Sequence, residues 1–286
     1  MIGYNRLGSN GRLGNQMFQY AALRGIAAKR GYEWCIPPDT YDHKDNYGLF
    51  ETFEMANVKE SNLGFVNGQS AEENDYCFIP EFFDECPDNV SLEGYFQTEK
   101  YFTHIADEIH EDFTFKQEYL NPCKEYIDSL DAPPIFLHVR QLDNIGREEY
   151  HPILPISFFE EALSNFSDDT PCFVFTDDMN WCKSQEFFKQ KRFLFNENNQ
   201  TYSYKTIDGK GKMQNTLLPQ VDLCLMSLCS GGIISNSSFS WWGAWLQNNR
   251  GKIIAPNPKK WFGSAMTHLD TSDIIPDKWI TQDWSK

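Results

Sequence analysis

Polar side chains follow three apolar segments in the C-terminal half of the chain, in a pattern that suits the binding of an anion. His138 and Arg140 end one apolar run, Asp177 and Asp178 follow a second, and the segment 235–240 follows a third. The planar guanidinium of an arginine can bind a diphosphate through paired hydrogen bonds. In open α/β sheets, ligands bind beyond the carboxyl ends of the strands. We therefore expect a phosphate site at the rim that these segments share.

A polar segment lies between the apolar run 231–234 and a run rich in tryptophan, and consists of Ser235, Asn236, Ser237, Ser238, Phe239 and Ser240. This order predicts a buried strand, a turn and the start of a helix. Hydroxyl and amide groups there can cap the helix and leave backbone N–H groups pointing outward, which makes an anion cradle. The alternative is an ordinary capped core helix, and this segment alone does not distinguish the two.

The other polar residues of the rim also have two interpretations each. Arg140 can bind a phosphate or pair with a neighbouring acid. Asp177 and Asp178 can hold Mg²⁺, but successive residues of an extended chain point in opposite directions, so we favour a cap of the helix expected at 179–190. His138 can donate to a phosphate or bond its neighbours.

Asp222 interrupts an apolar surface of the helix expected at 215–229, one residue after Val221. A carboxylate in this position can accept the two N–H donors of a guanine edge, whereas the alternative is an exposed helix position. The residue types alone do not choose between these.

The second half of the chain alternates between strand and helix patterns. We expect strands at 135–140, 172–176, 193–195, 231–235 and 253–255, and helices at 155–166, 179–190, 215–229 and 239–248, the last ended by Gly251. Such alternation predicts a largely parallel, doubly wound α/β sheet. The best linker is Asp131-Ala132-Pro133-Pro134, because two prolines cannot continue a helix. It divides the chain into domains 1–132 and 133–286.

The N-terminal half opens with a short strand and a turn containing Gly8, Gly11 and Gly14, which is not the dinucleotide-binding spacing. Asn15 can cap the helix that follows, and Gly31 can end it. A strand follows at 33–36, loops with short elements at 37–90, a strand end and turn at 91–97, and helices near 102–109 and 117–130. The loops of 37–90 could form an acceptor pocket.

Bulk composition excludes several classes of protein. The net charge of −16 over 286 residues argues against a nucleic-acid-binding surface. The eight cysteines form no CxxC pair, so neither a zinc ribbon nor a redox motif is indicated. The first residues, Met-Ile-Gly-Tyr, lack the basic-then-apolar pattern of a secretory leader, and the sequence has no run of about 18 apolar residues, so we expect neither a leader nor a membrane-spanning helix. We expect a cytoplasmic protein with free thiols.

Four motifs resemble those of the bacterial α-1,2-fucosyltransferases of glycosyltransferase family 11. They are Gly-Arg-Leu-Gly-Asn-Gln-Met-Phe-Gln-Tyr-Ala at 11–21, Gly-Tyr-Phe-Gln at 94–97 followed by Tyr101-Phe102, Phe173 to Asp178, and Ser235 to Leu246. The last is long and specific. Together they span most of the chain.

The resemblance implies an α/β fold of GT-B type, with two Rossmann-like domains facing across a cleft. The C-terminal domain would hold GDP-fucose and the N-terminal domain the acceptor. The reaction would be inverting: a galactose-type hydroxyl of a glycan or O-antigen attacks the anomeric carbon of GDP-β-L-fucose. Neither a metal nor another cofactor is expected, and a lipid-linked acceptor would bring the enzyme to a membrane surface.

The resemblance also implies roles for individual residues. Arg140, His138 and the helix start at 236–240 would bind the diphosphate and stabilise its charge as it leaves. Asp222 would bind guanine, and Asn15 would face the donor from the N-terminal domain. Asp143 is the candidate general base, with an ion pair to Arg147 as the alternative.

One departure from the family concerns the motif His-x-Arg-Arg-Gly-Asp-Tyr, which here reads His-Val-Arg-Gln-Leu-Asp-Asn at 138–144. Gln141 and Leu142 replace an arginine and a glycine, and Asn144 replaces the tyrosine. Two further hypotheses follow: a transferase of the same fold that uses another nucleotide sugar, and a catalytically silent protein that binds GDP or sugars.

Overall fold

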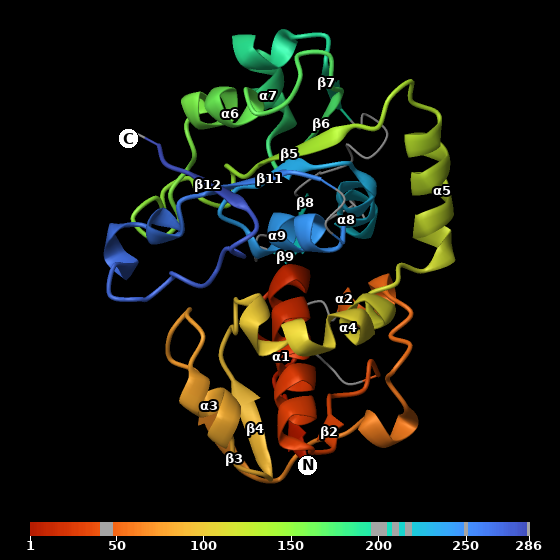
Figure 1. The fold of residues 1–286 in the computed structure, drawn as a ribbon, viewed down its shortest axis with the longest axis vertical. Coiled ribbons are helices and arrows are strands. Elements are labelled where there is room, and N and C mark those ends of the chain that lie inside the picture. Colours follow the sequence, from red (N-terminus) through yellow and green to blue (C-terminus); the bar gives the residue numbers. More distant parts are fainter. Residues whose placement is uncertain (41–47, 196–204, 208–211, 215–218, 249–250, 285–286) are drawn as a thin grey trace. The chain divides into compact units, whose positions relative to one another are not determined.

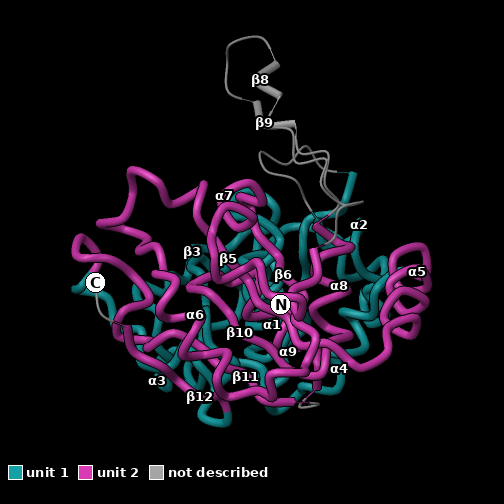
Figure 2. Tube along the Cα trace, turned by 90° about the horizontal axis from the view of Figure 1, so that it is seen from above, with its two compact units in different colours: residues 1–116, 267–278 teal, residues 117–266, 279–286 magenta. Residues whose placement is uncertain are grey.

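The computed structural model describes residues 1–40, 48–195, 205–207, 212–214, 219–248 and 251–284 (Figure 1). The chain forms two compact units, coloured separately in Figure 2. Unit 1 comprises residues 1–116 and 267–278, and unit 2 comprises residues 117–266 and 279–286. No helix among the described residues is long and apolar enough to cross a membrane.

Unit 1 is built on a four-stranded sheet in the order β2-β1-β4-β3, in which all pairs of neighbours are parallel. The strands are β1 (Ile2–Gly3), β2 (Trp34–Cys35), β3 (Gln69–Glu72) and β4 (Val90–Glu93). The helices are α1 (Leu13–Arg30), α2 (Gly48–Thr52), α3 (Pro80–Glu85) and α4 (Ala106–Asp112). Short 3₁₀ turns at Glu60–Asn62, Glu99–Tyr101 and Thr103–Ile105 connect them.

Helix α1 confirms the predicted helix and its end but corrects its start. Gly31 follows the helix in the left-handed conformation (φ 67°), and its N–H bonds the carbonyl of Ala28 at 3.3 Å. The N-terminal cap is Arg12, so Asn15 lies within the first turn and does not cap. The prediction failed because the glycine-rich turn passes directly into the helix two residues before Asn15.

Unit 2 contains a six-stranded parallel sheet in the order β12-β11-β10-β5-β6-β7. The strands are β5 (Ile135–Val139), β6 (Cys172–Thr176), β7 (Phe193–Phe195), β10 (Gly232–Ile233), β11 (Ile253–Pro256) and β12 (Ile280–Gln282). From β5 the chain adds β6 and β7 on one side and later β10, β11 and β12 on the other. The direction of winding therefore reverses between β5 and β10, which is where open α/β sheets bind ligands.

Helices cover both faces of this sheet, with α6 (Ile156–Leu163) and α7 (Met179–Ser184) on one side and α8 (Pro219–Leu228) and α9 (Ser238–Trp245) on the other (Figure 1). Strands β5, β6 and β11 are buried throughout, which explains their continuous apolar sequences. The side chains of Ile135, Leu137 and Val139 belong to the core that contains α6. His138 lies on the opposite face, where its ring is 6.3 Å from that of Phe239 in α9.

Several helices of unit 2 are shorter than predicted. The segment 179–190 divides into α7 and a 3₁₀ turn, Glu186–Lys189. Helix α9 ends at Trp245 and therefore is not stopped by Gly251. The predicted helix start at 215–218 lies outside the described residues. Strand β12, the 3₁₀ turns Pro258–Lys260 and Ser264–Met266, and the antiparallel pair β8 (Lys205–Ile207) and β9 (Lys212–Gln214) were not predicted.

The boundary between the units differs from the one predicted at Pro133 and Pro134. Helix α5 (Gln117–Asp128) belongs to unit 2 because it packs against α8 and the sheet: Cys123 Sγ lies 3.8 Å from the carbonyl oxygen of Val221, and Tyr126 makes an edge contact with Phe173. Residues 267–278 return to unit 1. These contacts join residues far apart in sequence, which a local composition signal does not register.

Substitution of Gly31 by alanine tests the end of α1. Nothing lies within 4 Å of an added Cβ, so the cost is the left-handed backbone conformation. We expect Gly31→Ala to lower the free energy of unfolding by about 1–2 kcal/mol in urea denaturation. Gly64→Ala is the control, because its site is equally open and its φ is not positive. Equal effects of the two substitutions would contradict this account.

Candidate active site

The predicted residues of unit 2 come together at the carboxyl ends of β10, β5 and β6, which are neighbours in the parallel sheet. His138 lies in β5 and Arg140 follows it, Asp177 follows β6, and Ser235 to Ser240 follow β10. The convergence expected from the strand pattern is thus present, at the point where the winding of the sheet reverses. What each side chain does there differs from residue to residue.

His138 bonds a neighbouring strand end. Its Nδ1 lies 2.7 Å from Oγ of Ser235, and the side chain is buried. Burial, with a smaller contribution from the charge of Arg140, lowers the pKa of His138 to about 3. The imidazole is therefore neutral at physiological pH and cross-links β5 to β10. Of the two interpretations open from the sequence, the structure favours the bond to a neighbour.

Arg140 provides the cation of the site. Its Nη1 donates to Oγ of Ser237 at 3.2 Å, and its Nη2 pairs with Oδ2 of Asp143 at 3.3 Å. The side chain is about one-third exposed, at 32%. A guanidinium has five N–H donors, and these two bonds engage only two of them. Arg140 is thus fixed in direction and still able to bind a ligand from solvent.

The two adjacent aspartates have separate structural tasks. Asp178 caps α7 by accepting a hydrogen bond from the backbone N–H of Trp181 at 2.9 Å, as predicted. Asp177 is not a cap: its carboxylate accepts from the N–H of Gln141 at 2.8 Å and from that of Asp143 at 3.2 Å. Burial raises the pKa of Asp177. Asp177 therefore holds the segment after β5 that carries Asp143.

The start of α9 divides the predicted donor-binding residues into buried and accessible ones. Asn236, Ser237 and Ser240 are buried. The Nδ2 of Asn236 donates to the carbonyls of Pro152 and Trp261, so its amide group connects the start of α9 to the two segments that contain these residues. Ser238 and Phe239 are partly exposed at the beginning of the helix. The first N–H groups of a helix have no intrahelical partner, so this end can bind an anion.

The structure shows the surroundings of Asp143 and of Asp222, each of which has two interpretations from the sequence. Asp143 forms an ion pair with Arg140, three residues before it in the sequence. Asp222 is 7% exposed in α8, so it is not an exposed helix position.

Asn15 lies in unit 1, whereas the other predicted residues lie in unit 2. Its Oδ1 accepts a hydrogen bond from Nε2 of Gln97 at 3.0 Å. This bond joins the first motif of the chain to the Gly94–Gln97 turn.

The tasks of two residues were not predicted from the sequence. Ser235 was placed in the polar segment 235–240 but was given no role of its own. Asp177 was interpreted with Asp178 as a cap of the helix that follows, whereas it bonds the segment after β5. The partners of both residues are distant in sequence, so only the fold shows them.

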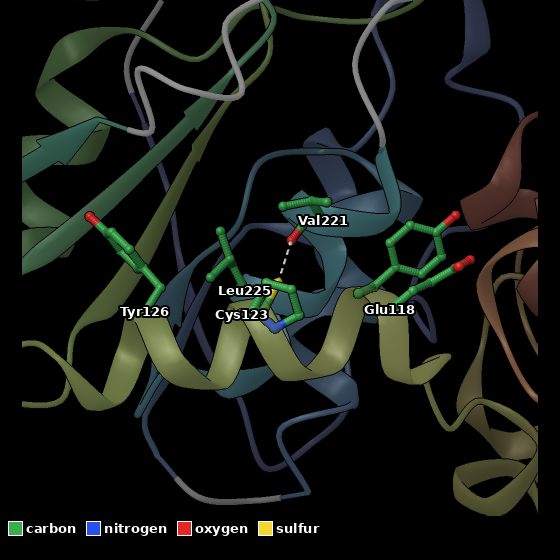
Figure 3. A pocket seen from close by; sticks show the side chains of 7 residues that line it. Glu118, Cys123, Tyr126, Val221 and Leu225 are labelled. Carbon is green, nitrogen blue, oxygen red and sulfur yellow. Dashed lines mark hydrogen bonds between the residues drawn. The ribbon is translucent and has the colours of Figure 1, made fainter.

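A separate hollow lies in unit 2 between α5 and α8 (Figure 3). It is lined by Tyr119, Pro122, Cys123 and Tyr126 on α5 and by Val221 and Leu225 on α8, among others. None of the predicted site residues lines it. Among the described residues, no group of three or more histidine, cysteine, aspartate or glutamate side chains is arranged to hold a metal ion. All eight cysteines are free thiols, as predicted.

Comparison with known proteins agrees with this architecture. The sequence profile of Glycosyl transferase family 11 matches residues 1–282. The chain belongs to this family.

Two relatives from Escherichia coli align over almost the whole chain. One is an alpha-1,2-colitosyltransferase, 28% identical over 94% of this chain and 96% of its own length. The other is the O-antigen biosynthesis glycosyltransferase WbnK, 27% identical over 95% of this chain and 98% of its own length. A galactoside 2-alpha-L-fucosyltransferase, SEC1 of Bos taurus, is 24% identical over 84% of this chain and 63% of its own.

Solved structures show the same fold. POFUT1 in complex with GDP superposes with a TM-score of 0.51 over 88% of this chain and 95% of its own, at 11% identity. NodZ alpha-1,6-fucosyltransferase co-crystallized with GDP superposes with a TM-score of 0.51 over 85% of this chain and 90% of its own, at 12% identity. The predicted α/β, GT-B-like class with Rossmann-like domains is therefore confirmed.

The buried imidazole predicts a pH dependence of stability in this family 11 glycosyltransferase. The pKa of His138 is below that of an unfolded histidine, near 6.5, so the unfolded state binds a proton first as the pH falls. The stability it contributes is complete above about pH 6.5 and is lost toward pH 3, by up to about 1.4 kcal/mol per pH unit. We expect His138→Gln to show a shallower loss of unfolding free energy between pH 6.5 and 4. Identical slopes in both proteins would disprove a depressed pKa for His138.

Proposed function

We propose that the enzyme transfers L-fucose from GDP-β-L-fucose to a galactose-type hydroxyl of a glycan or O-antigen, with inversion and an α-1,2 linkage. The observation that carries this proposal is Arg140, fixed by Ser237 and Asp143 where the winding of the sheet reverses. A cation fixed there suits the diphosphate of a nucleotide sugar. The relatives reported above include an alpha-1,2-colitosyltransferase and a galactoside 2-alpha-L-fucosyltransferase.

The chemistry of the leaving group agrees with these residues. The acceptor oxygen bonds to the anomeric carbon while the bond from that carbon to the diphosphate oxygen breaks, so GDP leaves with increased negative charge. Arg140 and the start of α9 stabilise this charge as it develops. His138 is neutral and acts by keeping Ser235 and β10 in place. We propose that the reaction needs no metal, since Arg140 and the helix start supply the positive charge.

The remaining roles are assigned to three residues. Asp222 binds the guanine edge, and Asn15 contacts the donor from unit 1. Asp143 accepts the proton of the acceptor hydroxyl. Its carboxylate is partly exposed, at 21%, and its ion pair with Arg140 places it beside the proposed phosphate site.

A second candidate is a transferase that uses another GDP-linked sugar. Two observations favour it: one relative is named as a colitosyltransferase, and Gln141 and Leu142 replace the family's arginine and glycine. Leu142 is 39% exposed beside the partly exposed Arg140, whereas Gln141 is buried. Colitose is L-fucose without the hydroxyl at C3, so an apolar residue near the donor sugar suits it better than a guanidinium does.

A donor panel separates the two candidates. Release of GDP would be measured from GDP-fucose, GDP-colitose, GDP-mannose and UDP-galactose, with and without β-galactosides, in EDTA. We expect turnover of GDP-fucose that depends on the acceptor and persists in EDTA. Turnover of GDP-colitose alone would replace the first candidate with the second. Binding of GDP without turnover of any donor would indicate a silent binding protein.

The double substitution Gln141→Arg, Leu142→Gly tests the specificity element. Restoring the family residues should raise turnover of GDP-fucose relative to that of GDP-colitose if this segment selects the donor. An unchanged ratio would show that it does not.

Substitution of Arg140 tests the phosphate site directly. We expect Arg140→Ala to weaken GDP binding by about 1.5–3 kcal/mol, the usual contribution of a hydrogen bond to a charged group. Isothermal titration calorimetry with GDP measures it. Arg147→Ala is the control, since it removes the same charge from an exposed position on the same loop. Undiminished GDP affinity in Arg140→Ala would remove this residue from the site.

A further inference from the structure

A buried carboxyl group lies at the carboxyl edge of the unit 1 sheet, outside the proposed donor site. Glu73 directly follows β3, and its backbone N–H bonds the carbonyl of Glu93, at the end of β4, at 2.8 Å. The side chain is 7% exposed. Its Oε2 accepts hydrogen bonds from the backbone N–H groups of Tyr95 at 3.1 Å and Phe96 at 2.5 Å. Glu73 thus binds the turn that leaves β4.

This turn, Gly94–Gln97, has an unfavourable backbone. Phe96 adopts a left-handed conformation (φ 52°), which is rare for a residue with a bulky side chain. Gly94 has φ 147°, and a Cβ there would lie 2.8 Å from Cβ of Glu73. Two hydrogen bonds to one carboxylate oxygen compensate for such a conformation. Without Glu73, the N–H groups of Tyr95 and Phe96 would lose these acceptors.

The turn is also connected to the first motif of the chain. The carbonyl of Gly94 accepts hydrogen bonds from the hydroxyl of Tyr4 and from Nε2 of Gln19. Gln97 donates to Asn15, the residue proposed to contact the donor. The ring of Tyr95 stacks on that of Tyr76 at 5.6 Å and 17°. One carboxyl group therefore fixes a segment that carries both an aromatic face and the partner of Asn15.

We propose that Glu73 is a positioning residue of the transfer reaction, which holds the Gly94–Gln97 turn so that Gln97 orients Asn15 and Tyr95 keeps its place beside Tyr76. This inference rests on the proposed function for the reaction that it serves. The contact itself lies wholly within unit 1.

The ionisation of Glu73 provides a signature of this role. Burial raises its pKa to about 8, while hydrogen bonds from Phe96, Tyr95 and Tyr101 oppose the rise and the charge of Asp75 adds to it. The other titratable groups that interact with it are Tyr4, which follows β1, and Tyr76, in the loop after β3. The ionised carboxylate is the stronger acceptor. Positioning should therefore weaken as the pH falls through about 8.

The test compares Glu73→Gln and Glu73→Ala with Glu72→Gln, a control at the exposed neighbouring residue. We expect Glu73→Gln to lower kcat/KM for the acceptor about tenfold above pH 8, where Glu73 is ionised and a charge-assisted hydrogen bond is lost, and to remove the inflection near pH 8. The far-UV circular dichroism spectrum of Glu73→Gln should match that of the wild type, which shows that the protein is folded. A wild-type kcat/KM and pH profile in Glu73→Gln would overturn the proposal.

Hydrogen–deuterium exchange separates this inference from the proposed function. The amides of Tyr95 and Phe96 should lose protection in Glu73→Ala and keep it in Glu72→Gln. Unchanged protection in Glu73→Ala would overturn the positioning role whatever the enzyme transfers. Lost protection in a protein whose wild type turns over no donor would show that the proposed function has failed and that the contact is real.

Discussion

The parallel pairing of β10, β5 and β6 is the constraint on which the rest of unit 2 depends. Helices cover both faces of this sheet, so its strands carry apolar side chains almost throughout. Charged and hydrogen-bonding side chains therefore lie mostly at the strand ends, where the backbone leaves the sheet. His138 is the exception within β5, and it is accommodated as a neutral ring bonded to Ser235. Burial of the sheet thus decides where the charge of Arg140 can lie.

Much of this architecture could be predicted because a strand buried on both faces has a continuous run of apolar residues, which is easily recognised in the sequence. Strand β6 has the predicted bounds, since the apolar run Cys172 to Phe175 is followed by Thr176 and two aspartates. Strand β3 was missed for the opposite reason. It lies at the edge of the unit 1 sheet and is largely exposed, so Gln69 to Glu72 show no apolar pattern.

The composition of the candidate site was less predictable than its location. Residue types indicated that Asn236 and Ser240 belong near a ligand, but both are buried, and Asn236 binds two backbone carbonyls. Asp177 and Glu73 are further examples, since each accepts two backbone N–H groups from a segment distant in sequence. Hydrogen bonds between distant segments depend on strand order, which local sequence does not encode.

The return of residues 267–278 to unit 1 affects the order in which the protein can fold during synthesis. This segment supplies Asp273, which pairs with Lys100 and accepts from the backbone N–H of Phe78. Domains generally fold as units while the chain is being made, beginning with the N-terminal one. Here neither unit is a continuous stretch of chain, and strand β12 of unit 2 lies still further along. Unit 1 can therefore be completed only after residues 267–278 have left the ribosome, and unit 2 only after β12 has.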